Sequence, residues 1–339
     1  MKNSSDFASL LSGFLGNYLP LQKNTSNKTI SSYRDTFKLL LIYLETERGI
    51  KPGKIKMKDL TSQLILDFLS WLEIERKNSI STRNQRLSAI RSFFRYAQFE
   101  MPEGLAQFQS ILTLPSKKSP KTEVPYLTAE EMKALLSCPS QSTARGRRDL
   151  CLLCFLYDSG CRVQELIDLR VRDLTLFPKG IAALTGKGGK TRRIPLEQGT
   201  VNLLDAYLRE QHLSGPEKYD WSVFTGSRGN KLTREGVTYI ISKYIAPARD
   251  KIASIPEQIK PHMFRHSRAM ALLQAGVSLI YIRDFLGHSD LKTTEIYAKY
   301  DPELKRKAIE GVVPTIITTP VPAKDWTDDT SLMDWLKSL

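Results

Sequence analysis

Apolar residues recur at helical spacing throughout the first hundred positions of the chain. Four helices are expected there, over residues 6–19, 28–47, 61–77 and 79–99. The second begins polar and ends in the run KLLLIYLE, so its C-terminal part must be buried. Asp59 or Thr61 is placed to cap the third helix, because short polar side chains accept hydrogen bonds from the first free backbone amides. The segment is therefore expected to form a small all-helical domain.

The pattern changes twice over the middle of the chain. Pro, Lys and Ser accumulate over residues 115–125, which predicts a linker. Beyond it, residues 149–159 form a nearly all-apolar helix that is expected to be central. Short β-prone runs broken by glycine and proline then fill residues 174–195, which predicts a small antiparallel sheet with a Lys-Gly-Gly-Lys turn. Helices resume near Glu197 and continue to about Glu310.

These patterns predict a mainly α fold with a small antiparallel β-sheet. The expected divisions are an N-terminal helical domain (1–114), a linker (115–125), a second domain (126–312) and a tail (313–339). The tail begins with a Pro-rich spacer and ends in DDTSLMDWLKSL, an amphipathic helix with Leu332, Trp335, Leu336 and Leu339 on one side. Docking of this helix on its own domain and docking on a neighbouring protomer are both open at this point.

The charge of the chain favours a polyanionic partner. Its formal net charge is +14, and Lys and Arg side chains displace the counterions condensed on phosphates. From the charge alone, a basic protein that binds no polyanion is an equally good interpretation. Cys151 and Cys154 lie in the apolar run CLLCFLY and are expected to be reduced core residues. Neither a signal peptide nor a membrane-spanning stretch is apparent, so a cytoplasmic protein with no membrane partner is expected.

Four short stretches carry side chains suited to chemistry. They are GCRVQEL with Arg162, TGKGGKTRRIPL with Lys187, PHMFRHS with His262 and Arg265, and LGHSDLKTTEIY with His288 and Tyr297. Each stretch by itself is weak evidence of function, because an arginine or a tyrosine is more often structural. The glycine turn is also too short for a phosphate-binding P-loop. His262 and His266 stand four apart without the glutamate of an HExxH zinc motif, which argues against a metal site.

In this order and spacing, the four stretches resemble the tyrosine recombinases: phage integrases, Xer-type recombinases and transposon-encoded relatives. The family's pattern is an arginine in a G-x-R-x-x-E-L box, a lysine in a G-K-G turn, H-x-x-R, L-G-H, and a tyrosine nine residues later. Every position matches here, and the resemblance covers about residues 10–310. It implies a SAM-like core-binding domain at the N-terminus and an α+β catalytic domain after it.

The resemblance implies catalytic roles, without metal or other cofactor, for Arg162, Lys187, His262, Arg265, His288 and Tyr297. Guanidinium groups suit the charge that builds on a phosphodiester's nonbridging oxygens, and a tyrosine can store the broken bond as a 3′-phosphotyrosyl ester. The family implies that Lys187 protonates the leaving 5′ oxygen, with Lys190 as an alternative. Glu165 is expected to orient a neighbour, and His266 and Ser267 are expected to be structural or to support the site.

The family also closes its two domains as a clamp around duplex DNA. The expected DNA-facing residues carry hydroxyl, amide and guanidinium groups, which contact phosphates and base edges. They are Thr29, Ser32, Tyr33, Arg34, Thr82, Arg83, Asn84, Arg86, Lys190 and Arg192. For Lys190 and Arg192, plain surface charge on a strand is an equal alternative. The expected partners are double-stranded recombination sites and other protomers of a synaptic tetramer, with the tail acting in trans.

Two other functions compete with recombination. A type IB topoisomerase shares the phosphotyrosyl chemistry but relaxes DNA without exchanging partners. A DNA-binding regulator that lost activity is the second alternative, and the complete set of six catalytic side chains argues against it. A role in a mobile element, as an integrase or transposase, is preferred because of the added Pro-rich tail.

Overall fold

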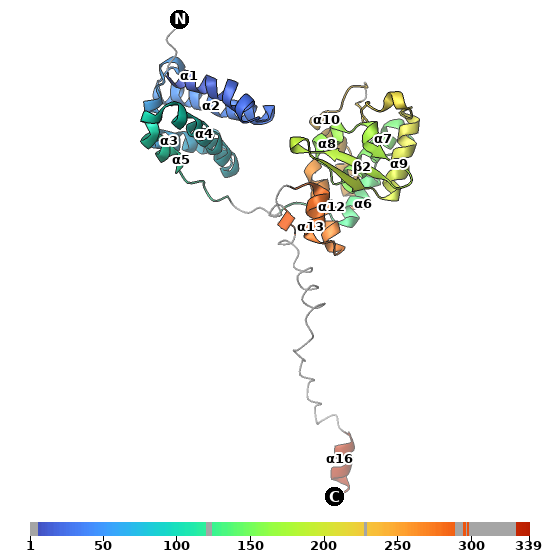
Figure 1. Ribbon diagram of the computed structural model, residues 1–339. Coiled ribbons are helices and arrows are strands. Elements are labelled where there is room, and N and C mark those ends of the chain that lie inside the picture. Colours follow the sequence, from blue (N-terminus) through green and yellow to red (C-terminus); the bar gives the residue numbers. More distant parts are fainter. Residues whose placement is uncertain (1–5, 120–123, 227–228, 289–293, 296, 298–329) are drawn as a thin grey trace. The chain divides into compact units, whose positions relative to one another are not determined.

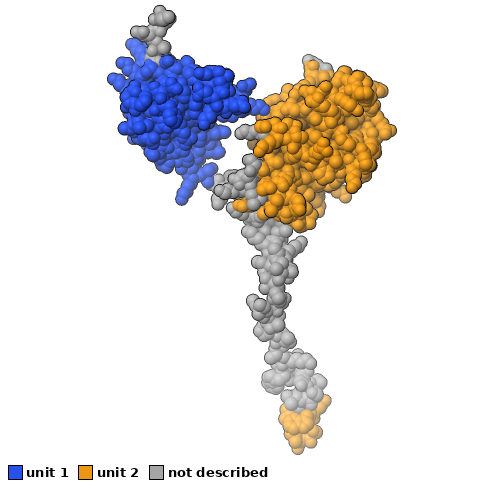
Figure 2. Space-filling view, in the orientation of Figure 1, with its two compact units in different colours: residues 1–122 blue, residues 123–339 orange. Residues whose placement is uncertain are grey.

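The chain forms two compact units, residues 1–122 and 123–339 (Figure 2). The computed structural model describes residues 6–119, 124–226, 229–288, 294–295, 297 and 330–339. Each unit has its own buried hydrophobic cluster. Both units are mainly helical, and a small antiparallel sheet lies in the second (Figure 1). The predicted fold class is confirmed.

The first unit is a helical bundle. Its elements are α1 (Asp6–Gly13), the π-helix η1 (Phe14–Gln22), α2 (Asn27–Arg48), α3 (Ser62–Ile74), α4 (Ile80–Glu100) and α5 (Leu105–Leu112). Three of these helices begin at a hydroxyl residue whose side chain accepts a hydrogen bond from the amide three residues on. These residues are Ser26, Thr61 and Ser79. Thr61 rather than Asp59 therefore caps α3.

Helix α5 lies in a segment where the sequence pattern predicted no helix. It buries Phe108 and Ile111 against the unit's core, and the Phe108 ring lies 5.4 Å from that of Phe94 in α4. The helix has eight residues, so its apolar positions are too few to give a clear period. It extends the helical domain by one element beyond the four predicted.

The second unit surrounds a central apolar helix with further helices and the sheet. The helices are α6 (Ala129–Leu136), α7 (Ala144–Asp158), α8 (Val163–Asp168), α9 (Gln198–Glu210), α10 (Arg234–Ser242), α11 (Ile245–Lys251), α12 (Pro261–Gln274) and α13 (Leu279–Leu286). Helix α7 contacts α6, α9 and α12, and its Leu152, Leu153, Phe155 and Leu156 are fully buried. The prediction of a central helix over residues 149–159 is confirmed.

The sheet has three antiparallel strands in the order β1 (Leu174–Thr175), β2 (Ile181–Thr185) and β3 (Thr191–Pro195). Ala182 pairs with Ile194, and both side chains are buried beneath the sheet. The turn between β2 and β3 passes through Gly188 and Gly189 at φ values of 78° and 73°. Residues with a Cβ atom rarely adopt that region, which explains the glycine pair in the predicted turn.

The tail is described over its last ten residues, where α16 (Thr330–Lys337) forms. Trp335, Leu336 and Leu339 are exposed there. The Pro-rich spacer and the side chain of Leu332 lie outside the described residues. Among the described helices, none combines the length and apolar character needed to cross a bilayer.

Candidate active site

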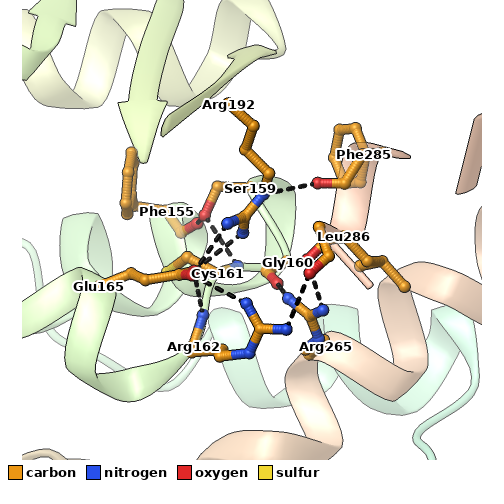
Figure 3. A network of polar contacts seen from close by, with 11 residues as sticks. Phe155, Ser159, Gly160, Cys161, Arg162, Glu165, Arg192, Arg265, Phe285 and Leu286 are labelled. Atoms are coloured by element: carbon orange, nitrogen blue, oxygen red, sulfur yellow. Dashed lines mark hydrogen bonds and ion pairs between the residues drawn. The ribbon is translucent and has the colours of Figure 1, made fainter. Parts of the chain in front are cut away.

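Three arginines converge on the C-terminal end of α13. The last carbonyls of a helix have no partner within the helix and carry a partial negative charge. Here three consecutive carbonyls each accept a hydrogen bond from a different element (Figure 3). Arg192 of β3 donates to Phe285, Arg265 of α12 donates to Leu286, and Arg162, which precedes α8, donates to Gly287.

Gly287 makes this convergence possible. It ends α13 in the left-handed region, at φ 65° and ψ 46°. A Cβ atom at this position would lie 2.9 Å from Cδ of Arg192. The glycine of the L-G-H stretch therefore allows both the turn of the backbone and the close approach of an arginine.

Glu165 links two of the three arginines. Its carboxylate oxygens accept from both terminal nitrogens of Arg192 at 2.8 Å, and one also accepts from Arg162 at 3.0 Å (Figure 3). Burial raises the pKa of this carboxyl, but the hydrogen bonds from Arg192 and Arg162 outweigh it and leave the pKa lowered. Glu165 is therefore ionised at neutral pH, and it orients Arg162 as the sequence analysis expected.

Arg265 is the most deeply placed of the three arginines. Its side chain is fully buried, and it also donates to the carbonyl of Gly160 at 2.8 Å. Burial, with Arg162 and Arg192 nearby, lowers its pKa to about 10, so the guanidinium stays charged at neutral pH. Its Nε has no acceptor among the described residues, which is unfavourable for a buried donor. Within the part of the chain that the structure describes, this cation is thus incompletely satisfied.

Three histidines lie around the arginines. His262 and His266 stand one turn apart on α12, with ring centroids 4.5 Å apart. Nδ1 of His288 forms a hydrogen bond with the hydroxyl of Thr294 at 2.9 Å. Burial, followed by the positive charge of Arg265 and Arg162, lowers the pKa of His262 and lowers that of His288 to about 3. His262 and His288 are therefore neutral at pH 7 and can donate or accept hydrogen bonds.

Tyr297 is buried beside these histidines. Its side chain is 2% exposed and belongs to an apolar cluster with Met270 and Leu286. Its hydroxyl forms a hydrogen bond with Nδ1 of His266 at 2.8 Å. Burial raises the pKa of the phenol to about 12, although Arg265 opposes the shift. Tyr297 is thus protonated in the free protein, and its partner is a histidine to which the sequence analysis gave a supporting role.

The expected proton donor lies in the hairpin turn between β2 and β3, where Lys187 and Lys190 are the two candidates. Lys187 begins the turn, but its side chain lies outside the described residues. Lys190 is exposed at the end of the turn, next to a hydrogen bond of 2.9 Å between the hydroxyls of Thr185 and Thr191. The choice between the two lysines therefore stays a prediction.

Within the described ranges, no group of three His, Cys, Asp or Glu residues is arranged to hold a metal ion.

The expected DNA-facing residues of α4 mostly bond within the first unit. Arg83 is 3% exposed and pairs with Glu73 at 3.4 Å. Arg86 donates to the carbonyl of Ser32 and to the hydroxyl of Thr36, both at 3.0 Å. These guanidiniums join helices of the bundle, so their availability to DNA is reduced.

Most of the other predicted residues of the first unit also have partners within that unit. Asn84 bonds the backbone of Lys117 in both directions, and Thr82 shares a hydrogen bond of 3.0 Å with the cap Ser79. Tyr33 stacks on Phe14. Thr29 shares a hydrogen bond of 3.0 Å with the cap Ser26. Arg34 remains exposed beside Ser31 and Asp35, and of the ten predicted residues it is, with Lys190, the most accessible. In the second unit, the Arg192 side chain is 13% exposed and turned inward to Glu165.

Two basic residues were missed by the sequence analysis. A groove of about 350 Å³ adjoins the arginine cluster, and its lining includes Arg162, His262, Arg234 and Lys260. Arg234 begins α10 and donates to the side chain of Gln164 at 3.1 Å. The position of Lys260 directly before the P-H-M-F-R stretch could have indicated it as a site residue. No feature of the sequence indicated Arg234, because it lies far from every motif.

The fold and this site together define the class of the protein. Residues 125–303 match the phage integrase family, and residues 13–100 match its N-terminal SAM-like domain. The chain is 37% identical over 316 residues to a putative integrase/recombinase, y4rC, of Sinorhizobium fredii, covering 93% of this chain and 94% of the relative. It is 33% identical to the tyrosine recombinase XerD of Listeria innocua, covering 85% and 93%.

Solved structures agree in fold. The XerH site-specific recombinase in a post-cleavage complex is similar at a TM-score of 0.66 and 20% identity, covering 92% of this chain and 91% of that one. A Tn1549 transposon integrase is similar at a TM-score of 0.69 and 15% identity, covering 91% and 100%. The chain belongs to the phage integrase family and is a tyrosine recombinase enzyme.

Proposed function

We propose that this recombinase cuts and rejoins DNA strands at specific sites through a 3′-phosphotyrosyl bond on Tyr297, without metal or ATP. The observation that carries the proposal is the convergence of Arg162 and Arg265 on adjacent carbonyls at the end of α13. The same segment leads to His288 and on to Tyr297. Two cations and a tyrosine in one site suit a phosphodiester, which is anionic and needs both charge stabilisation and a nucleophile.

The proposed reaction is a transesterification. Arg162 and Arg265 bind the nonbridging oxygens of the scissile phosphate, where negative charge increases in the transition state. His262 and His288, neutral at pH 7, add hydrogen bonds. The Tyr297 oxygen attacks phosphorus, and the leaving 5′ oxygen takes a proton from Lys187, with Lys190 as the alternative. Attack by a 5′ hydroxyl on the phosphotyrosyl bond reverses the step.

The two units are proposed to bind duplex DNA as core-binding and catalytic domains, with boundaries at residues 1–114 and 126–312. The net charge of +14 supports a polyanionic partner. Among the predicted contact residues, Arg34 and Lys190 are the most accessible. Arg234 and Lys260 join the set, since their groove continues from Arg162.

We propose further that four protomers act together at two sites and that the tail docks in trans. Exposed Trp335 and Leu336 on α16, and Leu339 just beyond it, support this, because a short amphipathic helix gains stability by burying its apolar side. A cytoplasmic integrase or transposase of a mobile element is the biological role we favour, on the ground of the added tail.

A suicide substrate nicked near the cut tests the proposal, because loss of the short fragment traps the covalent intermediate. Wild type is expected to form a denaturant-resistant protein–DNA adduct, and Tyr297→Phe is expected to form none while binding the site normally. An equal adduct with the Phe variant would show that another residue is the nucleophile. Binding without any adduct in wild type would favour the regulator. Relaxation of supercoiled DNA without partner exchange would favour the topoisomerase.

A further inference from the structure

The hydroxyl of Tyr297 is paired with a residue outside the six expected catalytic side chains. His266 Nδ1 lies 2.8 Å from it, and the two rings are 5.6 Å apart. The expected catalytic histidines are engaged elsewhere: Nδ1 of His288 contacts Thr294, and His262 meets the His266 ring edge to face. Among the described residues, His266 is therefore the group placed to receive a proton from this phenol.

Both partners in this hydrogen bond are uncharged at neutral pH. Burial, followed by His262 and Arg265, lowers the pKa of His266 to about 4, so its ring is neutral at pH 7. Burial keeps the phenol of Tyr297 protonated. A neutral imidazole has one nitrogen that accepts and one that donates. In the tautomer that carries its N–H on Nε2, Nδ1 accepts from the phenol and is free to take its proton.

We propose that His266 is the general base for the attack of Tyr297, an inference that rests on the proposed phosphotyrosyl function. As the Tyr297 oxygen bonds to phosphorus, its proton passes to Nδ1 of His266. The bond from phosphorus to the 5′ oxygen breaks, and that oxygen takes a proton from the hairpin lysine. In rejoining, the 5′ hydroxyl returns its proton to the lysine amine, and the imidazolium of His266 returns its proton to Tyr297.

Charge on the bound DNA makes His266 a stronger base. Besides burial, the groups that lower its pKa are His262 and Arg265, both on its own helix. A scissile phosphate bound by Arg162 and Arg265 offsets the charge of Arg265 and stabilises the imidazolium. The base is thus weak in the free protein and gains strength with substrate, which keeps the phenol protonated until DNA is present.

The substitution His266→Asn separates proton transfer from positioning. The Asn carbonyl reaches the place of Nδ1 and accepts a hydrogen bond, but it cannot take a proton. Adduct formation on the suicide substrate is expected to slow by ~100-fold or more, the usual contribution of a general base. Binding to the intact site is expected to be unchanged, and so is the melting temperature. His212→Asn, at an exposed histidine beyond α9, is the matched control.

A substrate with sulfur in place of the bridging 5′ oxygen locates the proton that is affected. A thiolate leaves without protonation, so this substrate should restore Lys187→Ala but leave His266→Asn slow. Restoration of His266→Asn would place its role at the leaving group and overturn the proposal. So would a His266→Asn rate within about threefold of wild type, since general bases contribute far more. Should His266→Asn melt lower than wild type, His266→Gln is judged by the same criteria.

The two proposals fail in different ways. Absence of an adduct in wild type would remove the phosphotyrosyl function itself. A normal wild-type adduct that is equally fast in the folded His266→Asn variant would remove the role of His266 alone.

Discussion

Glu165 and Arg192 form a two-point ion pair, with both carboxylate oxygens accepting from guanidinium nitrogens at 2.8 Å. The pair joins β3 to α8, and Nε of Arg192 donates to the carbonyl of Phe285 at the end of α13. The hairpin that carries Lys187 is thereby fixed to the two elements that hold Arg162 and His288. Lys187 is the proposed proton donor, and its placement relative to the arginines is expected to depend on Arg192.

Replacement of Arg192 by Lys is expected to slow adduct formation on the order of 10- to 100-fold, because small displacements of catalytic groups have effects of that size. A lysine cannot reproduce the paired hydrogen bonds to a carboxylate. Site binding is expected to change little, since the arginine faces inward. Arg193→Lys, an exposed neighbour on the same strand, is the control. Equal rates for both variants would show that the ion pair does not position the hairpin.

Gly287→Ala tests the end of α13. The left-handed backbone costs an alanine roughly 1–2 kcal/mol, and the new methyl group would displace Arg192 as well. Gly276→Ala isolates the backbone cost, because φ is +82° there and nothing lies within 4 Å of the added Cβ. Thermal unfolding should show both variants destabilised. Adduct formation should be lost mainly in Gly287→Ala, and a similar loss in Gly276→Ala would contradict the role of the arginine contact.

The sequence predicted much of the site because each motif is local. The arginine, histidine and tyrosine stretches each fall within a few residues, and the structure brings Arg162, Arg265, His288 and Tyr297 together through α13. The contacts that organise them join residues far apart along the chain. Arg192 meets Phe285 across 93 positions, and no periodicity reports such a pair. Its inward direction was therefore not predictable.

The same limit explains why the partners of the expected DNA-facing residues were not predicted. Arg83 and Arg86 were predicted from their residue type on an amphipathic helix, where a guanidinium suits phosphate. The structure gives them partners in other segments, Glu73 and Ser32. A pattern along one helix shows which side chains are polar but not which neighbour reaches them. His266 is a further example, because only the fold brings it into hydrogen-bond contact with Tyr297.

Stability of the catalytic unit is expected to fall as the pH drops. The pKa of His266 is lowered to about 4 and that of His288 to about 3, against 6.5 for an ordinary histidine. The unfolded chain therefore binds more protons than the folded protein below about pH 6.5. Folding stability is full above that pH and declines through the range down to these values, with a slope of roughly 1.4 kcal/mol per pH unit for each proton.

Urea unfolding at a series of pH values measures this slope. His266→Asn should flatten it, because a group whose pKa is lowered on folding is removed. A profile that stays level from pH 7 to 4 would contradict the lowered pKa values.

Arg234 and Lys260 are expected to contact phosphate. Each Ala variant should weaken DNA binding equally for all sequences and reduce the slope of log affinity against log salt by about 1. Binding titrations over a range of salt concentrations measure that slope. Arg209→Ala, at a residue paired with Asp205 outside the groove, serves as the control. An unchanged slope in both groove variants would exclude phosphate contacts there.

Deletion of residues 323–339 is expected to weaken synapsis and strand exchange while leaving binding to a single site unchanged. The segment holds four aspartates and two lysines, so its loss removes no net positive charge from the DNA-binding surface. What it removes is the exposed apolar side chains Trp335 and Leu336 of α16 and Leu339 beyond the helix. Trp335→Ala in the full chain should reproduce the defect, and Ser338→Ala should not. Gel mobility separates single-site complexes from paired ones. Full recombination by the truncated protein would mean that the tail has no part in joining protomers.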